Sequence, residues 1–113
     1  MSTRETLEII VSSKVLEKAN NIKDDLQVLS ENGGLYSYIL EGSKEGYHCV
    51  VVDTAEKYAT CTPCVGFTTK GICSHIVAAL LKVDEIEGEE RVARVIETII
   101  AEGLNKGGKD RSK

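Results

Sequence analysis

The sequence predicts an α+β domain in which an antiparallel β-meander leads through a zinc-knuckle loop into a helix, with further helices at both ends. Three observations predict this architecture. Short runs of β-branched residues are separated by glycine-containing turns, metal-binding side chains follow the last run, and apolar residues recur at helical spacing on either side. The length of 113 residues is that of one compact domain.

Residues 1–25 are predicted to form an N-terminal helix. Ser2 and Glu5 have the spacing of a capping box, in which the two side chains satisfy backbone N–H groups at the start of a helix. The apolar stripe that follows is typical of a helix that packs on its own core. It is wider than one core contact needs, so part of it is a candidate for contact with a second chain, namely Leu7, Ile10 and Val11.

Residues 26–62 are predicted to form four antiparallel strands joined by tight turns. Asn32-Gly33-Gly34 is a strong hairpin signal, because asparagine and glycine accept the positive φ angles that the favoured hairpin turns require. Gly42–Gly46 provides a second turn. The expected strands are Leu26–Ser30, Leu35–Leu40, Tyr47–Val52 and Lys57–Thr62.

Successive side chains point to opposite faces of each predicted strand. Tyr36 and Tyr38 share one face, where aromatic rings most often cover a core. The same two rings are candidates for contact with a protein partner, and stacking on nucleobases is a further alternative. Cys49 lies among valines and is predicted to pack in the core as a small hydrophobe. His48 points to the other face and is predicted at the surface.

A Cys-x₂-Cys pair followed by Cys-x-His is the most informative motif of the chain. Four soft donors this close in sequence can enclose one Zn²⁺ tetrahedrally, at about 2.3 Å for sulfur and about 2.0–2.1 Å for nitrogen. Protein would fill all four positions, which leaves no place for water or substrate. The motif therefore predicts structural zinc in a protein that is not an enzyme, with the ligands Cys61, Cys64, Cys73 and His75.

The four cysteines and the histidines allow three alternatives to this ligand set. Disulfides among the four cysteines are disfavoured by the expected intracellular setting, and a catalytic Cys–His pair lacks a third, orienting group. His48 could replace Cys64 if the geometry of the loop fails. Cys73 and Ser74 are predicted at the start of a helix that ends the zinc-binding segment, residues 26–86, because helix N-termini favour a thiolate.

Residues 87–105 are predicted to form the last helix. Its apolar stripe begins at Val92, and Gly103 is its expected stop. The remaining residues, 106–113, form a basic tail that is predicted to be disordered.

The formal net charge of −4 argues against capture of nucleic acid over the whole surface. No export signal opens the sequence, and no apolar run approaches the roughly 20 residues of a membrane span. A cytoplasmic, nuclear or nucleoid-associated protein is expected, neither secreted nor held in a membrane.

The zinc-binding segment resembles a SWIM-type zinc finger. The resemblance is carried by Tyr58–Cys64 and then by Gly71–Leu81, in which Cys-x-His opens an aliphatic helix, with Phe67 as the loop aromatic. It covers roughly residues 26–83 and departs at one place, where the family has Cys-x-Cys and this chain has Cys-x₂-Cys.

Small, stand-alone SWIM proteins resemble the recombination adaptors of Shu-like complexes. The resemblance implies a zinc-stabilised adaptor that partners a RecA-family recombinase paralogue, or a second copy of itself, in DNA recombination and repair. The N-terminal helix and the sheet edge are then the expected docking surface. Direct DNA binding is the alternative, because SWIM domains also occur in transposases. An enzyme or redox device is a third hypothesis and would need an open metal position or an exposed, low-pKa thiol.

Overall fold

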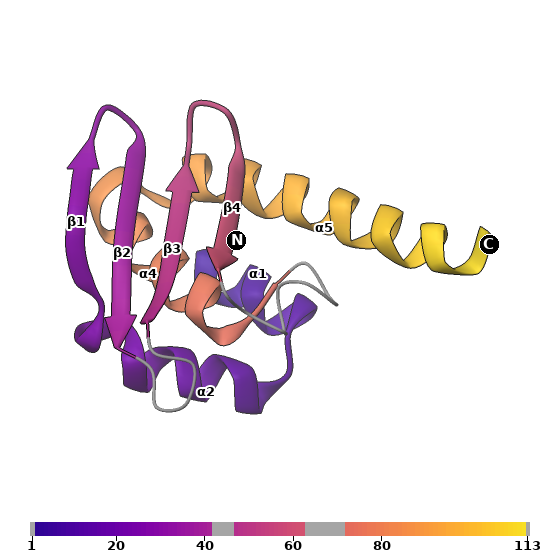
Figure 1. Ribbon diagram of the computed structural model, residues 1–113, viewed down its shortest axis with the longest axis horizontal. Coiled ribbons are helices and arrows are strands. Elements are labelled where there is room, and N and C mark those ends of the chain that lie inside the picture. The colour runs from indigo at the N-terminus through magenta and orange to yellow at the C-terminus, as the bar shows by residue number, and fades with distance from the viewer. Residues whose placement is uncertain (1, 42–46, 63–71, 113) are drawn as a thin grey trace.

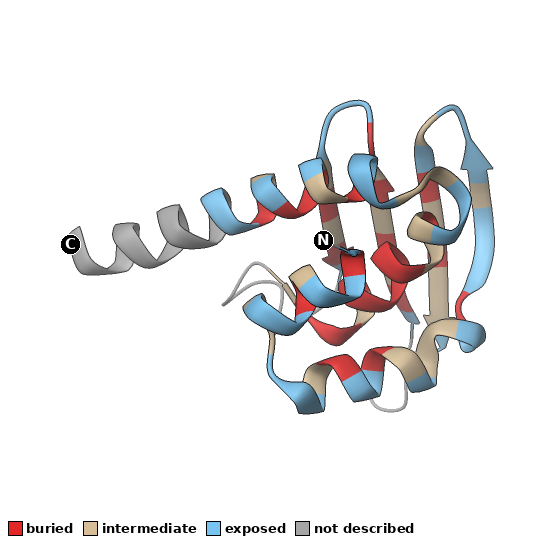
Figure 2. Ribbon diagram, turned by 180° about the vertical axis from the view of Figure 1, so that it is seen from behind, coloured by how far each residue is buried: buried red, intermediate tan, exposed pale blue. Residues whose placement is uncertain are grey.

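The computed structural model describes residues 2–41, 47–62 and 72–112, with side chains described as far as residue 101. One antiparallel sheet carries all the helices on a single face, as the two opposite views show (Figures 1 and 2). The fold is therefore α+β, as the sequence predicts. The elements are α1 (Thr3–Ile10), α2 (Ser13–Ile22), the 3₁₀ turn η1 (Lys23–Asp25), β1 (Gln27–Asn32), β2 (Leu35–Glu41), β3 (Tyr47–Asp53), β4 (Tyr58–Thr62), α4 (Ser74–Glu87) and α5 (Glu89–Ser112).

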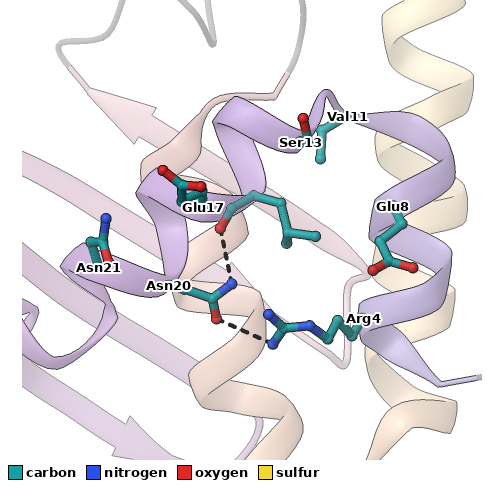
Figure 3. A pocket seen from close by; sticks show the side chains of 8 residues that line it. Arg4, Glu8, Val11, Ser13, Glu17, Asn20 and Asn21 are labelled. Carbon is teal, nitrogen blue, oxygen red and sulfur yellow. Dashed lines mark hydrogen bonds between the residues drawn. The ribbon is translucent and has the colours of Figure 1, made fainter.

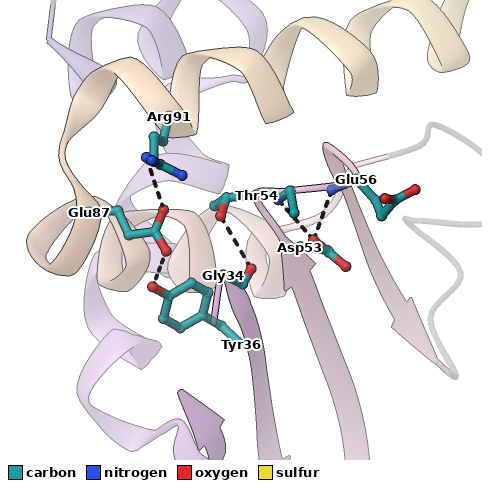
Figure 4. Close-up of polar contacts among 8 residues, drawn as sticks. Gly34, Tyr36, Asp53, Thr54, Glu56, Glu87 and Arg91 are labelled. Atoms are coloured by element: carbon teal, nitrogen blue, oxygen red, sulfur yellow. Dashed lines mark hydrogen bonds and ion pairs between the residues drawn. The ribbon is translucent and has the colours of Figure 1, made fainter. Parts of the chain in front are cut away.

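The sheet is a meander with the strand order β1-β2-β3-β4. The hairpin turn between β1 and β2 has both of its glycines at positive φ, +62° for Gly33 and +87° for Gly34. Thr54, just after β3, donates its backbone N–H to the carbonyl of Gly34 at 2.8 Å, and its hydroxyl donates to the same carbonyl at 3.3 Å (Figure 4). A Cβ on Gly34 would lie 2.9 Å from the Thr54 hydroxyl, so both backbone angle and space favour glycine there.

Helix α4 occupies the centre of the molecule. Residues on every side of this helix are buried, including Ile76, Val77 and Leu80 at 0% exposure. A helix that is apolar all round must be covered on all sides. It contacts β3 and β4 of the sheet on one side and α1, α2 and α5 on others. The first turn of α4 is thereby fixed against the helix-covered face of the sheet.

The N-terminal segment contains two helices, so the prediction of one helix is wrong. The capping box at Ser2 and Glu5 is present as predicted. The chain then becomes extended at Val11, with φ −127° and ψ 159°. Ser12 starts a second helix by accepting a hydrogen bond from the backbone N–H of Val15 at 3.2 Å. A serine N-cap is a local signal for the start of a new helix. The prediction missed it because the apolar stripe runs through both helices.

Helix α5 runs to Ser112, so neither the predicted stop at Gly103 nor the disordered tail over 106–113 is found; the last residue lies outside the described part. Glycine in a helix interior costs only about 1 kcal/mol relative to alanine and removes no backbone hydrogen bond. The predicted apolar stripe is confirmed, because Val92, Val95, Ile96 and Ile99 are buried.

Cys49 does not lie in the core. It is only partly buried, whereas its neighbours His48 and Val50 are buried on the helix-covered face, so strand alternation places Cys49 on the face that carries no helix. The run from Cys49 to Val52 is apolar on both faces of the strand, so its composition could not identify the buried face.

Candidate metal centre

Two candidate ligands come from adjacent strands of the sheet. Val50 of β3 lies opposite Cys61 of β4 in the antiparallel register. His48 is two residues before Val50 and therefore shares its face, diagonally across from Cys61. Both side chains are buried, with 5% exposure for His48 and 1% for Cys61. The pairing of β3 with β4 thus sets an imidazole and a thiol side by side on the helix-covered face.

The other candidates come from the start of α4. Cys73 is the N-cap residue of this helix, as predicted, and its backbone is extended with φ −147° and ψ 172°. Its side chain makes no capping hydrogen bond. His75 follows in the first turn, and its Nδ1 lies 3.7 Å from the Sγ of Cys73. A sulfur and a nitrogen on one tetrahedral zinc would be about 3.6 Å apart, from the usual bond lengths.

The strands and the helix meet at one cluster. One ligand atom each from His48, Cys61 and His75 lie within 4.8 Å of one another. The rings of His48 and His75 are stacked, with centroids 4.2 Å apart and an interplanar angle of 20°. Ligands of one tetrahedral zinc are about 3.3–3.8 Å apart. The three donors therefore lie close enough together to hold a metal ion.

The structure places three of the four predicted ligands. Cys61 and His75 lie together in the cluster, and Cys73 lies beside His75. Cys64 lies outside the described residues. His48 is a buried member of the cluster rather than a surface residue, so that prediction is wrong. Strand alternation alone could not have found it, because both faces of β3 are apolar. The burial of His48 follows from the sheet pairing, since His48 shares a face with Val50, which pairs with the buried Tyr38.

The side chains predicted to contact a partner are mostly interior. Leu7 and Tyr38 are fully buried and Tyr36 is 4% exposed, which favours the core-packing alternative for all three. Ile10 and Val11 are partly buried against the same core. A docking surface would have to be built from other side chains of the helix and the sheet.

The two buried tyrosines use carboxylates as acceptors. Tyr36 donates to Glu87, which also faces Arg91 (Figure 4), and Tyr38 donates to Glu31 at 2.8 Å. Burial, followed by the hydrogen bond to Glu87, raises the pKa of Tyr36 to about 12. Burial and the bond to Glu31 also raise the pKa of Tyr38. Both phenols therefore remain neutral donors that tie β2 to its surroundings.

A second concave feature lies apart from this cluster. A groove of about 550 Å³ is lined by residues of α1, α2 and their connection. Arg4 donates to the side chain of Asn20 at 3.3 Å across the groove, and Asn20 donates to the carbonyl of Leu16 at 3.1 Å (Figure 3). The side chains of Arg4 and Asn20 are thus bonded to each other across the groove.

Comparison of the chain with protein-family models, curated proteins and solved structures found no match. Within the described residues, no helix has both the length and the apolar character that crossing a bilayer requires. The function of this chain is therefore inferred from the chemistry of its own residues.

Proposed function

We propose that this chain is an interaction module stabilised by structural zinc, with Cys61, Cys73 and His75 among the ligands. The sequence predicts Cys64 as the fourth ligand, and this residue lies outside the described part of the chain. The observation that carries the proposal is the convergence of buried thiol and imidazole donors where the sheet meets the start of α4. Thiolate and imidazole donors favour zinc over magnesium and calcium, which prefer oxygen ligands. Thiol and imidazole donors are typical of structural zinc sites, so the proposal is for binding.

The role of the metal follows from the elements that supply the ligands. Cys61 belongs to β4, whereas Cys73 is the N-cap of α4, twelve positions later in the sequence, and His75 lies in the first turn of that helix. One zinc would therefore join β4 to α4 and fix this helix against the sheet. Because the ligands converge only in the folded chain, the binding free energy would add to folding stability. The result is a rigid surface for a partner.

The proposed partner is a RecA-family recombinase paralogue, which makes the chain an adaptor in DNA recombination and repair. The resemblance of the motif to SWIM proteins supports this partner. Exposed apolar side chains on the expected docking surface also support a protein partner: β1 is an edge strand with Val28 51% and Leu29 59% exposed, and Ile9 of α1 is 70% exposed.

Elemental analysis tests the metal. The purified, reduced chain should contain one zinc per chain, and native mass spectrometry should show that this zinc is lost with acid unfolding. A chain that folds cooperatively but carries no stoichiometric metal after zinc loading would contradict the proposal.

Affinity capture from native extract tests the partner. The zinc-loaded chain should retain a RecA-family ATPase, and Leu29→Glu should reduce that capture. Ile86→Glu is the matched control, because Ile86 is similarly exposed, at 52%, but lies on α4 rather than on the edge strand. Equal capture by both variants and the parent would remove the edge strand from the docking surface.

Direct DNA binding is the alternative that the sequence left open. The rings that were candidates for base stacking, Tyr36 and Tyr38, are buried, so they supply no stacking platform in this fold. DNA binding would be recognised by an affinity that falls steeply as salt increases. Nucleic acid as the sole captured species, released by moderate salt, would favour this alternative over the adaptor.

A further inference from the structure

We propose that His48 supplies the fourth metal ligand, so that the centre is Cys61, Cys73, His75 and His48. This inference rests on the proposed function in that a metal is bound, but it changes the ligand set. The metal would then join three elements, β3, β4 and α4, instead of two. The ligand set would be two sulfurs and two nitrogens, and Cys64 would not be required.

The register of the sheet provides the first argument. His48 and Cys61 occupy diagonal positions on the same face of β3 and β4, and the β3–β4 ladder continues through Cys49, which pairs with Thr62. A continuous ladder fixes the relative position of the two Cα atoms on that face. The imidazole therefore reaches the Cys61 thiol without any contribution from the residues that follow β4.

The distances provide the second argument. Among the described residues, donor atoms of His48, Cys61 and His75 all lie within 4.8 Å of one another, and Sγ of Cys73 lies 3.7 Å from Nδ1 of His75. The rings of the two histidines are stacked, with centroids 4.2 Å apart, so a rotation of at least one ring would point a nitrogen of each at a shared metal ion. Sulfur and nitrogen donors are thus gathered from all three elements.

Burial provides the third argument. His48 is 5% exposed, although histidine is usually only partly buried, and it lies on the helix-covered face beside a buried thiol. Packing alone is the competing explanation, since a flat ring stacked on His75 would fill the same space. The two explanations differ in what they predict for metal affinity: a structural role leaves it unchanged when the ring nitrogens are removed, whereas coordination makes it fall.

X-ray absorption of the zinc-loaded parent protein tests the ligand set directly. Two nitrogen and two sulfur neighbours are expected, at about 2.0–2.1 Å and about 2.3 Å. One nitrogen and three sulfurs would overturn the inference and leave the proposed zinc site intact. A parent protein that binds no zinc would refute both. This measurement needs no variant, so it decides the question even if a substitution prevents folding.

Paired variants provide the second readout. His48→Phe keeps a flat ring for stacking but removes both nitrogens, and Cys64→Ser removes the competing thiol. Loss of a residue that merely orients a ligand costs about 10–100-fold in metal affinity, so His48→Phe should weaken Zn²⁺ or Co²⁺ binding by at least about 10-fold. Cys64→Ser should leave affinity and the Co²⁺ thiolate charge-transfer intensity unchanged. The reverse ranking would overturn the inference.

Discussion

Replacement of Cys73 by serine should have opposite effects on stability with and without zinc. Cys73 is the N-cap of α4, yet its side chain makes no capping hydrogen bond, and its sulfur lies 3.7 Å from Nδ1 of His75. Serine is one of the best N-cap residues. It is also a poor zinc ligand, because a neutral hydroxyl replaces a thiolate. The substitution therefore improves the helix start and damages the metal site at once.

The two effects differ in size. A new serine cap should add about 0.5–1 kcal/mol to the free energy of unfolding of the metal-free chain. Zinc at 1,000 times its Kd stabilises a folded chain by about 4.1 kcal/mol, and a 100-fold weaker site at the same zinc activity contributes only about 1.4 kcal/mol. Loss of metal stabilisation thus outweighs the cap, so Cys73→Ser should lower the stability of the zinc-loaded protein by about 2 kcal/mol.

Urea unfolding followed by circular dichroism measures both states, once in a chelator and once at buffered zinc, under reducing conditions. Cys49→Ser is the matched control, because Cys49 lies on the opposite face of the sheet, and the difference between its zinc-loaded and metal-free stabilities should equal that of the parent. An equal loss of stability for Cys73→Ser in chelator and in zinc would show that Cys73 is a packing residue. Unchanged stability in zinc would show that it is not a ligand.

Three further predictions concern the scaffold that holds the cluster. Leu80→Ala should lower the free energy of unfolding by about 2–5 kcal/mol in urea, since Leu80 is fully buried at the centre of α4; a loss below 1 kcal/mol would contradict the placement. Ser12→Ala should cost about 1 kcal/mol through loss of the cap on Val15, whereas Ser12→Asp should restore most of it. The raised pKa of Tyr36, about 12 in the folded chain against 10.0 ordinarily, means that the folded state holds a proton that the unfolded chain releases. Its contribution to stability is full below pH 10 and is lost as the pH rises toward 12, so Tyr36→Phe should flatten the fall in stability over that range. Identical pH profiles for parent and variant would refute this assignment.

The sequence alone determined the elements that depend on local signals. The hairpin glycines, the alternating strands and the aliphatic run after Cys73 specify the meander and α4 because turn geometry and side-chain periodicity act between near neighbours. The spacing of Cys61, Cys73 and His75 likewise made them candidate ligands. The fold brings donor atoms of Cys61 and His75 within 4.8 Å of each other, with Cys73 3.7 Å from His75. The break at Ser12 was also local, but a continuous apolar stripe outweighed it in the prediction.

Only the tertiary structure decided which face of β3 is buried. Cys49 and Val51 are as apolar as Val50 and Val52, so the strand by itself permits either face inward. The choice is made by the pairing of β3 with β2 and β4 and by the helices that cover one side of the sheet. That choice moves His48 from the predicted surface to the cluster, because a strand turns its alternate side chains to opposite faces and the partners that bury one face are remote in sequence.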